Sequence, residues 1–140
     1  MKKIISIITA TAILFAACTK DNSMPQNNST NSTAVTGNFT ITKFTDRSSG
    51  ENKVSDFNGY VFTFSADGKI IAEKNGVSFQ GNYTEKPSHE GEGAKLSMSF
   101  SDAPLNDLNK SWQVELMTNS AIHLMDDDAS SGEVLEFTAK

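Results

Sequence analysis

Few residues in this 140-residue chain combine a reactive side chain with a partner at a spacing that supports catalysis. The only cysteine is Cys18, and the two histidines are His89, in a loop rich in Gly and Glu, and His123, beside apolar neighbours. A side-chain nucleophile needs a base within hydrogen-bond reach, and the sequence identifies no such partner for either histidine. Glu90 and Glu92 could in principle share a proton, but a loop of this composition would leave both hydrated. The sequence therefore predicts a protein that is not an enzyme and that holds no cofactor.

A run of three acids at residues 126–128 is the remaining cluster that could do chemistry. Its first and third members and Ser130 match the first three alternating ligands of an EF-hand calcium loop. The sixth position, however, is Ser131 instead of Gly, and the twelfth is Phe137 instead of Glu. The sequence predicts a solvated hairpin tip and no metal site, with weak Ca²⁺ binding as the alternative.

The first eighteen residues have the three-part layout of a secretory signal. Lys2 and Lys3 precede a 14-residue, largely apolar run at 4–17, and small residues stand directly before Cys18. A membrane-spanning helix needs ~20 apolar residues, whereas the apolar region of a signal peptide needs only ~7–15. The four residues Phe15-Ala16-Ala17-Cys18 resemble the Leu-x-x-Cys cleavage box of bacterial lipoproteins, with Phe in place of Leu.

This resemblance implies that cleavage leaves Cys18 as the first residue, with its thiol carrying diacylglycerol and its amine acylated by a fatty acid such as palmitate. A lone cysteine has no partner for an intramolecular disulfide. Two or more acyl chains anchor a protein stably, so we expect attachment to the outer membrane of a cell envelope through lipid alone. Lys20-Asp21 resembles part of a surface-export signal, but two solvated charges explain it equally well, and the leaflet stays open.

Charge and composition divide the rest of the chain into a tether and a domain. Removing residues 1–17 takes away two lysines and no acid, which leaves ten basic and seventeen acidic side chains and a net charge of −7. This charge argues against nucleic acid and anionic lipid as partners. Residues 18–36 hold the lipidated cysteine and a polar stretch with too little apolar surface to fold, and residues 37–140 form one domain.

The domain alternates apolar and polar residues with a period of two, which is typical of strands. The dipeptides Asp67-Gly68 and Asn75-Gly76 predict tight hairpin turns. We expect strands at residues 38–45, 59–65, 69–74, 77–84, 94–101, 111–118, 121–126 and 133–139.

Eight sequential antiparallel strands most simply close into an all-β, up-and-down barrel, because closure removes exposed edges. A two-sheet sandwich is the alternative. One helical turn is expected from Pro104 to Lys110, with Leu105 and Leu108 three residues apart, covering one end of the barrel.

Gly37-Asn38-Phe39 at the first strand, followed by an eight-stranded meander behind a lipid anchor, resembles the lipocalin-like domain of small bacterial lipoproteins. Lipocalins proper have Trp where this chain has Phe39. The resemblance implies a cup that holds a small hydrophobic molecule.

Two hypotheses for the function follow, and the barrel interior distinguishes them. In the first, a non-catalytic lipoprotein binds a small hydrophobic ligand inside its barrel. In the second, the interior is filled, and loops 46–58 and 85–93 contact a protein or glycan at the cell surface. Phe57 in the first of these loops is either part of a lid or part of the core. The aromatic residues that would line a ligand are Phe39, Tyr60, Phe62, Phe64, Phe79, Phe100 and Trp112.

Overall fold

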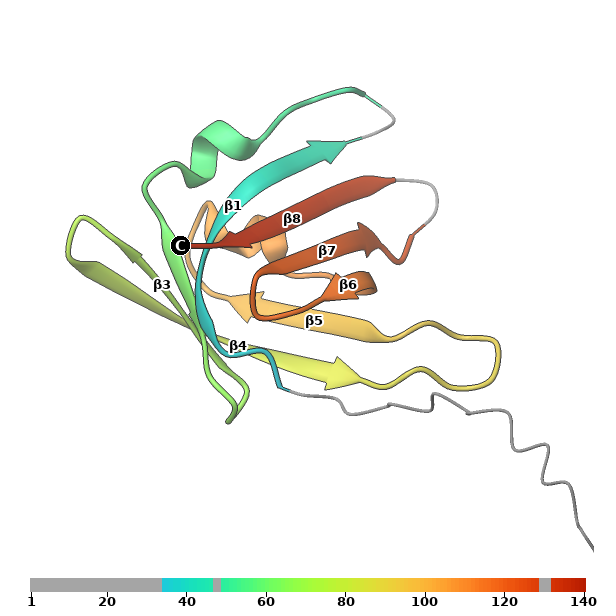
Figure 1. Ribbon diagram of the computed structural model, residues 1–140. Coiled ribbons are helices and arrows are strands. Elements are labelled where there is room, and N and C mark those ends of the chain that lie inside the picture. The colour runs from blue at the N-terminus through green and yellow to red at the C-terminus, as the bar shows by residue number, and fades with distance from the viewer. Residues whose placement is uncertain (1–33, 47–48, 129–131) are drawn as a thin grey trace, which may run out of the picture.

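The computed structural model describes residues 34–46, 49–128 and 132–140, and these form a closed antiparallel barrel (Figure 1). Each strand pairs with the next along the chain, and the last strand pairs with the first. The predicted eight-stranded up-and-down barrel is therefore confirmed. The strands are β1 (Gly37–Asp46), β2 (Val61–Phe64), β3 (Lys69–Lys74), β4 (Val77–Lys86), β5 (Lys95–Phe100), β6 (Ser111–Met117), β7 (Ala121–Asp126) and β8 (Glu133–Ala139).

The two predicted hairpin turns form as their sequences require. Gly68 has φ 81°, and Asn75 and Gly76 have φ 53° and 78°. These positive values are the ones that tight hairpin turns need and that Gly and Asn tolerate. The turns hold β2 against β3 and β3 against β4 at the expected positions.

Two short 3₁₀ helices lie where neighbouring strands separate. β1 pairs with β2 over only three residues, and β5 pairs with β6 over only three. Helix η1 (Val54–Phe57) precedes β2, and helix η2 (Leu105–Leu108) lies between β5 and β6. We call the end of the barrel that carries both helices the η rim, and the opposite end, where β1 begins, the N-terminal rim (Figure 1).

Both 3₁₀ helices contribute side chains to the core. Leu105 and Leu108 are fully buried, because residues three apart lie on one side of a 3₁₀ helix. This confirms the helical turn predicted within 104–110. Phe57 is 2 % exposed and its ring centre lies 5.6 Å from that of Phe44, so it belongs to the core.

The core begins before the first strand. Val35, which the sequence analysis assigned to the tether, is 2 % exposed and packs in the core. Its carbonyl oxygen lies 3.3 Å from the Tyr83 hydroxyl. The ordered part of the domain therefore includes residues N-terminal to β1.

Candidate functional site

The aromatic residues predicted to line a ligand converge inside the barrel. All belong to the hydrophobic core or pack against it, and Phe79 alone among them is only partly buried. The rings of six of them contact one another or Phe137 with centre-to-centre distances between 5.3 and 6.5 Å, and the Trp112 ring lies 6.1 Å from that of Phe44. Many of these contacts are edge-to-face, the geometry that aromatic pairs prefer. The rings therefore occupy the middle of the barrel.

Gly81 on β4 shows how closely this interior is packed. A Cβ atom at this position would lie 2.6 Å from the Phe100 ring and 2.7 Å from the carbonyl oxygen of Ser99. Real carbon atoms do not approach so closely, so the Phe100 ring occupies the space that a side chain at position 81 would need. Phe79, Gly81 and Tyr83 therefore form the expected inward-facing row of β4. Gly81 has no side chain in this row, and Phe100 of the neighbouring strand β5 occupies that space.

The η rim is closed by charged groups over aromatic rings. The Glu133 side chain is only 5 % exposed and forms ion pairs with Lys53, at 3.1 Å, and with Lys110. Lys110 also lies 3.3 Å from Asp126, whose side chain is 8 % exposed. The two lysine ammonium groups stand 5.4 Å from the centre of the Phe44 ring and 5.7 Å from that of the Trp112 ring. These contacts join the residues directly before η1 and β6 to β7 and β8.

The acidic run at 126–128 takes part in this closure, which corrects the expectation of a merely solvated tip. Asp126 pairs with Lys110, and Asp127 lies 2.7 Å from Lys95. The hydrogen bond to Asp127 is the main reason that the pKa of Lys95 is raised. Within the residues that the structure describes, no group of three or more His, Cys, Asp or Glu side chains is placed to hold a metal ion.

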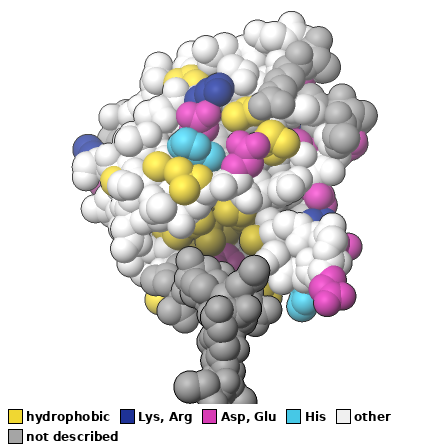
Figure 2. Space-filling view, turned by 45° about the vertical axis from the view of Figure 1, so that its right-hand side comes forward, with side chains coloured by type: hydrophobic (Ala, Val, Ile, Leu, Met, Phe, Trp, Pro, Cys, Tyr) yellow, Lys and Arg dark blue, Asp and Glu magenta, His cyan; other side chains and the backbone are white. Residues whose placement is uncertain are grey.

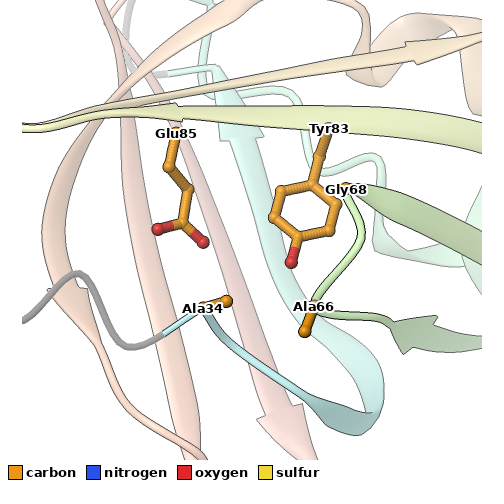
Figure 3. A pocket seen from close by; sticks show the side chains of 5 residues that line it. All are labelled: Ala34, Ala66, Gly68, Tyr83 and Glu85. Carbon is orange, nitrogen blue, oxygen red and sulfur yellow. The ribbon is translucent and has the colours of Figure 1, made fainter.

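The N-terminal rim contains a pocket of about 200 Å³ (Figure 3). Tyr83 and Glu85 extend from β4 into it, and their oxygen atoms point toward Ala34 and Ala66. The alternation that turns Tyr83 inward also turns Glu85 inward, since both lie on the same face of β4. The fifth lining residue is Gly68.

Tyr83 is held rigidly at this pocket. Its hydroxyl donates a hydrogen bond to the Ser65 carbonyl at 2.8 Å, and its backbone N–H donates to the Gly68 carbonyl at 2.8 Å. Burial raises the pKa of the Tyr83 phenol, and the negative charges of Glu85 and Asp67 add to the effect. Two carboxylates therefore lie close enough to oppose ionisation of the Tyr83 phenol.

The surface of the molecule has two other features. A groove of about 300 Å³ runs over β3 and β4, lined in part by Lys69, Gln80 and Asn82. In the view of Figure 2, hydrophobic side chains gather in a recess of the surface, with acidic and histidine side chains at its margins.

The two histidines lie on different parts of the chain. His89 is exposed in the connection between β4 and β5, where it forms an isolated bridge with Glu92. His123 is partly buried on β7, opposite Leu116 of β6 and Glu136 of β8.

The sequence did not predict that Glu85 lines the pocket at the N-terminal rim or that Glu133 is the buried acid of the η rim. Glu85 could have been found by extending the alternation of β4 by two residues, because the strand ends at Lys86 and not at 84. Glu133 carried no such signal, since its partners Lys53 and Lys110 lie on other segments. Cys18 and the predicted signal and tether residues up to 33 lie outside the described residues.

No helix in the described ranges has the length and apolar character needed to cross a bilayer. No protein-family model matches the chain, and a comparison with curated proteins finds no match.

Two solved structures resemble the chain. A DUF4847 family protein from Bacteroides vulgatus superposes with a TM-score of 0.53 and 14% identity, covering 76% of this chain and 94% of that one. A protein from Burkholderia xenovorans, solved by NMR, has a TM-score of 0.47 and 14% identity, with 77% of this chain and 84% of that one covered. At this identity the first likeness supports the barrel fold alone.

Proposed function

We propose that this chain is a non-catalytic cell-envelope lipoprotein, anchored in the outer membrane through Cys18, whose lipocalin-like barrel is a filled scaffold. Loops 46–58 and 85–93 present polar side chains to a protein or glycan partner. The signal layout of the first eighteen residues supports the anchor, and the barrel supports the scaffold.

The observation that carries the proposal is the aromatic packing inside the barrel. Small-molecule sites enclose roughly 300–1,000 Å³ and bury most of their ligand. Here the Phe62 ring by itself contacts three other rings, those of Tyr60, Phe100 and Phe137. The backbone at Gly81 has no room even for an added methyl group. A hydrophobic ligand in the middle of the barrel would have to displace these rings. This packing favours the scaffold over the hypothesis of a hydrophobic ligand inside.

The described residues of the two loops include exposed side chains, such as those of Glu51 and His89, on a backbone held by local hydrogen bonds, which suits recognition. In the described part of loop 46–58, Asp46 donates its N–H to the Glu51 carbonyl at 3.0 Å, and Gly50 donates to Asp46 at 2.8 Å. In loop 85–93, Glu92 donates its N–H to the His89 carbonyl at 2.9 Å. Loops that are positioned by a rigid scaffold commonly carry binding residues.

Mass spectrometry of the protein extracted gently from its own membrane tests the anchor and the scaffold together. We expect a chain that begins at Cys18 and carries diacylglycerol, with no stoichiometric hydrophobic molecule. A chain that keeps residues 1–17, or a tightly held apolar ligand, would contradict the proposal.

A photo-crosslinking residue in each loop tests the contact surface. Crosslinkers at positions 51 and 89 should capture the same partner in intact cells, whereas one at position 78, on the outer face of β4, should not. Equal capture from position 78 would assign the contact to the barrel wall.

A further inference from the structure

We propose that the groove over β3 and β4 binds a neutral saccharide, whose hydroxyl groups are held by the side-chain amides of Gln80 and Asn82. The groove measures about 300 Å³ and lies on the barrel wall, outside loops 46–58 and 85–93. The inference goes beyond the proposed function, because it depends neither on the lipid anchor nor on the partner of the loops.

The groove lies between two cross-strand rows of outward-facing side chains. In the register of β3 and β4, Ile71 stands opposite Gln80, and Lys69 stands opposite Asn82. The alternation of a strand places all four on the outer face, and the backbone between the two rows is already paired in the β3–β4 ladder. A ligand therefore meets side chains here, and a peptide that binds by adding a strand to a sheet edge finds no free edge.

The two amides are available to a ligand. Gln80 and Asn82 are exposed, and neither side chain has a hydrogen-bond partner among the residues that the structure describes. The Asn38 amide oxygen, by contrast, accepts a hydrogen bond from the Thr63 hydroxyl at 2.9 Å. A primary amide has two donors and an acceptor, and a hydroxyl group both donates and accepts. Each amide can therefore form paired hydrogen bonds with neighbouring hydroxyl groups of a sugar.

The charge of the lining favours a neutral ligand. Among the lining residues only Lys69 is charged, and its ammonium lies 3.1 Å from the Asp67 carboxylate. Because this pair is more than half exposed to solvent, neither charge attracts a ligand strongly. Hydrogen bonds to uncharged groups therefore decide which ligand the groove accepts.

The size and the apolar part of the groove fit one sugar ring. About 300 Å³ corresponds to the share of liquid volume of roughly ten water molecules, which is close to the number of heavy atoms in a hexose. The half-buried Ile71 side chain offers an aliphatic surface to the C–H groups of such a ring. None of the lining residues is aromatic, so no ring stacks on the sugar and the affinity should be low.

NMR titration of the full chain in detergent tests the assignment, with cellobiose, maltose and N,N′-diacetylchitobiose as probes. The side-chain amide signals of Gln80 and Asn82 should shift with at least one of them, at a Kd on the order of 1 mM. Butyrate and n-butylammonium, which are charged, should not shift these signals. No shift with any of the three disaccharides, shifts confined to loops 46–58 and 85–93, or equal shifts with the charged probes would each overturn the proposal.

Variants of the exposed amides locate the site. Gln80→Ala and Asn82→Ala should each weaken disaccharide binding about five- to tenfold, the loss expected for one or two hydrogen bonds. Gln113→Ala is the matched control, since it removes an exposed amide from β6 on another part of the barrel wall and should leave the Kd unchanged. Wild-type affinity in either folded groove variant, or an equal loss in Gln113→Ala, would refute the proposal.

Discussion

The Glu133 carboxylate accepts a hydrogen bond from the Lys53 ammonium at 3.1 Å, across 80 residues of sequence. The carboxylate also pairs with Lys110, so one buried acid at the start of β8 neutralises two lysines from different segments. Breaking a buried ion pair leaves uncompensated charge in a poorly solvated place. Glu133 is therefore the one acid of the η rim that pairs with both Lys53 and Lys110 among the ion pairs of the described residues.

Glu133→Gln should lower the free energy of unfolding by about 2–3 kcal/mol, somewhat less than the ~3–5 kcal/mol of fully buried pairs, because both lysines keep some access to water. Urea unfolding measures the change. Glu136→Gln is the matched control on the same strand, since the Lys43–Glu136 pair is 47% and 27% exposed and should contribute at most about 1 kcal/mol. Equal losses from the two variants would contradict the role assigned to Glu133.

Gly81→Ala should destabilise the barrel by about 1–3 kcal/mol, because the added methyl group would overlap the Phe100 ring. Gly93→Ala is the control, since its Cβ would meet only the Gln113 side chain, at 3.0 Å, which can move aside. The denaturation midpoint of the Gly93→Ala variant should therefore change little. In a Phe100→Leu background, Gly81→Ala should lower the free energy of unfolding by less than it does in the wild-type protein. If the losses of the two single variants simply add in the double variant, the two positions do not compete for space.

The side chain of Asn109 takes over strand pairing where β5 and β6 separate. Its Oδ1 accepts from the Phe100 N–H at 2.6 Å, and its Nδ2 donates to the Phe100 carbonyl at 2.7 Å. Asn109→Ala should cost about 1–3 kcal/mol, because both backbone groups lose their partner. Hydrogen exchange of the Phe100 amide should accelerate, whereas Asn106→Ala, an exposed change in η2, should leave it unaltered.

The sequence predicted what depends on neighbours along the chain. Period-two alternation and the turns at Gly68 and Gly76 are local, so strand boundaries came out within two residues of those observed. Tertiary relationships carried no such signal. The acid of β8 and its lysines are brought together only by closure of the barrel, and Val35 lies in the core beside the Tyr83 hydroxyl, which comes from a strand 48 residues further along the chain. The predicted aromatic residues lie in or against the core, but the sequence left open whether they fill the barrel or line a cavity, because that depends on how rings from different strands pack.

Tyr83 gives the barrel a dependence on alkaline pH. The pKa of its phenol is raised above 10.0 in the folded protein, mainly by burial and further by Glu85 and Asp67. Because the folded state holds this proton more tightly than the unfolded chain, the resulting stability is fully present below about pH 10 and is lost as pH rises through the folded pKa. Urea unfolding from pH 8 to 11 should therefore show a decline that is smaller in Tyr83→Phe.

The same variant has a separate effect at neutral pH. Tyr83→Phe should lose about 1–2 kcal/mol at pH 7, because the carbonyl of Ser65 no longer receives the hydroxyl hydrogen bond. Glu85→Gln should lower the Tyr83 pKa in an ultraviolet titration, since one of the negative charges that oppose tyrosinate is gone. An unchanged titration curve in Glu85→Gln would mean that the carboxylate and the phenol do not share the pocket at the N-terminal rim.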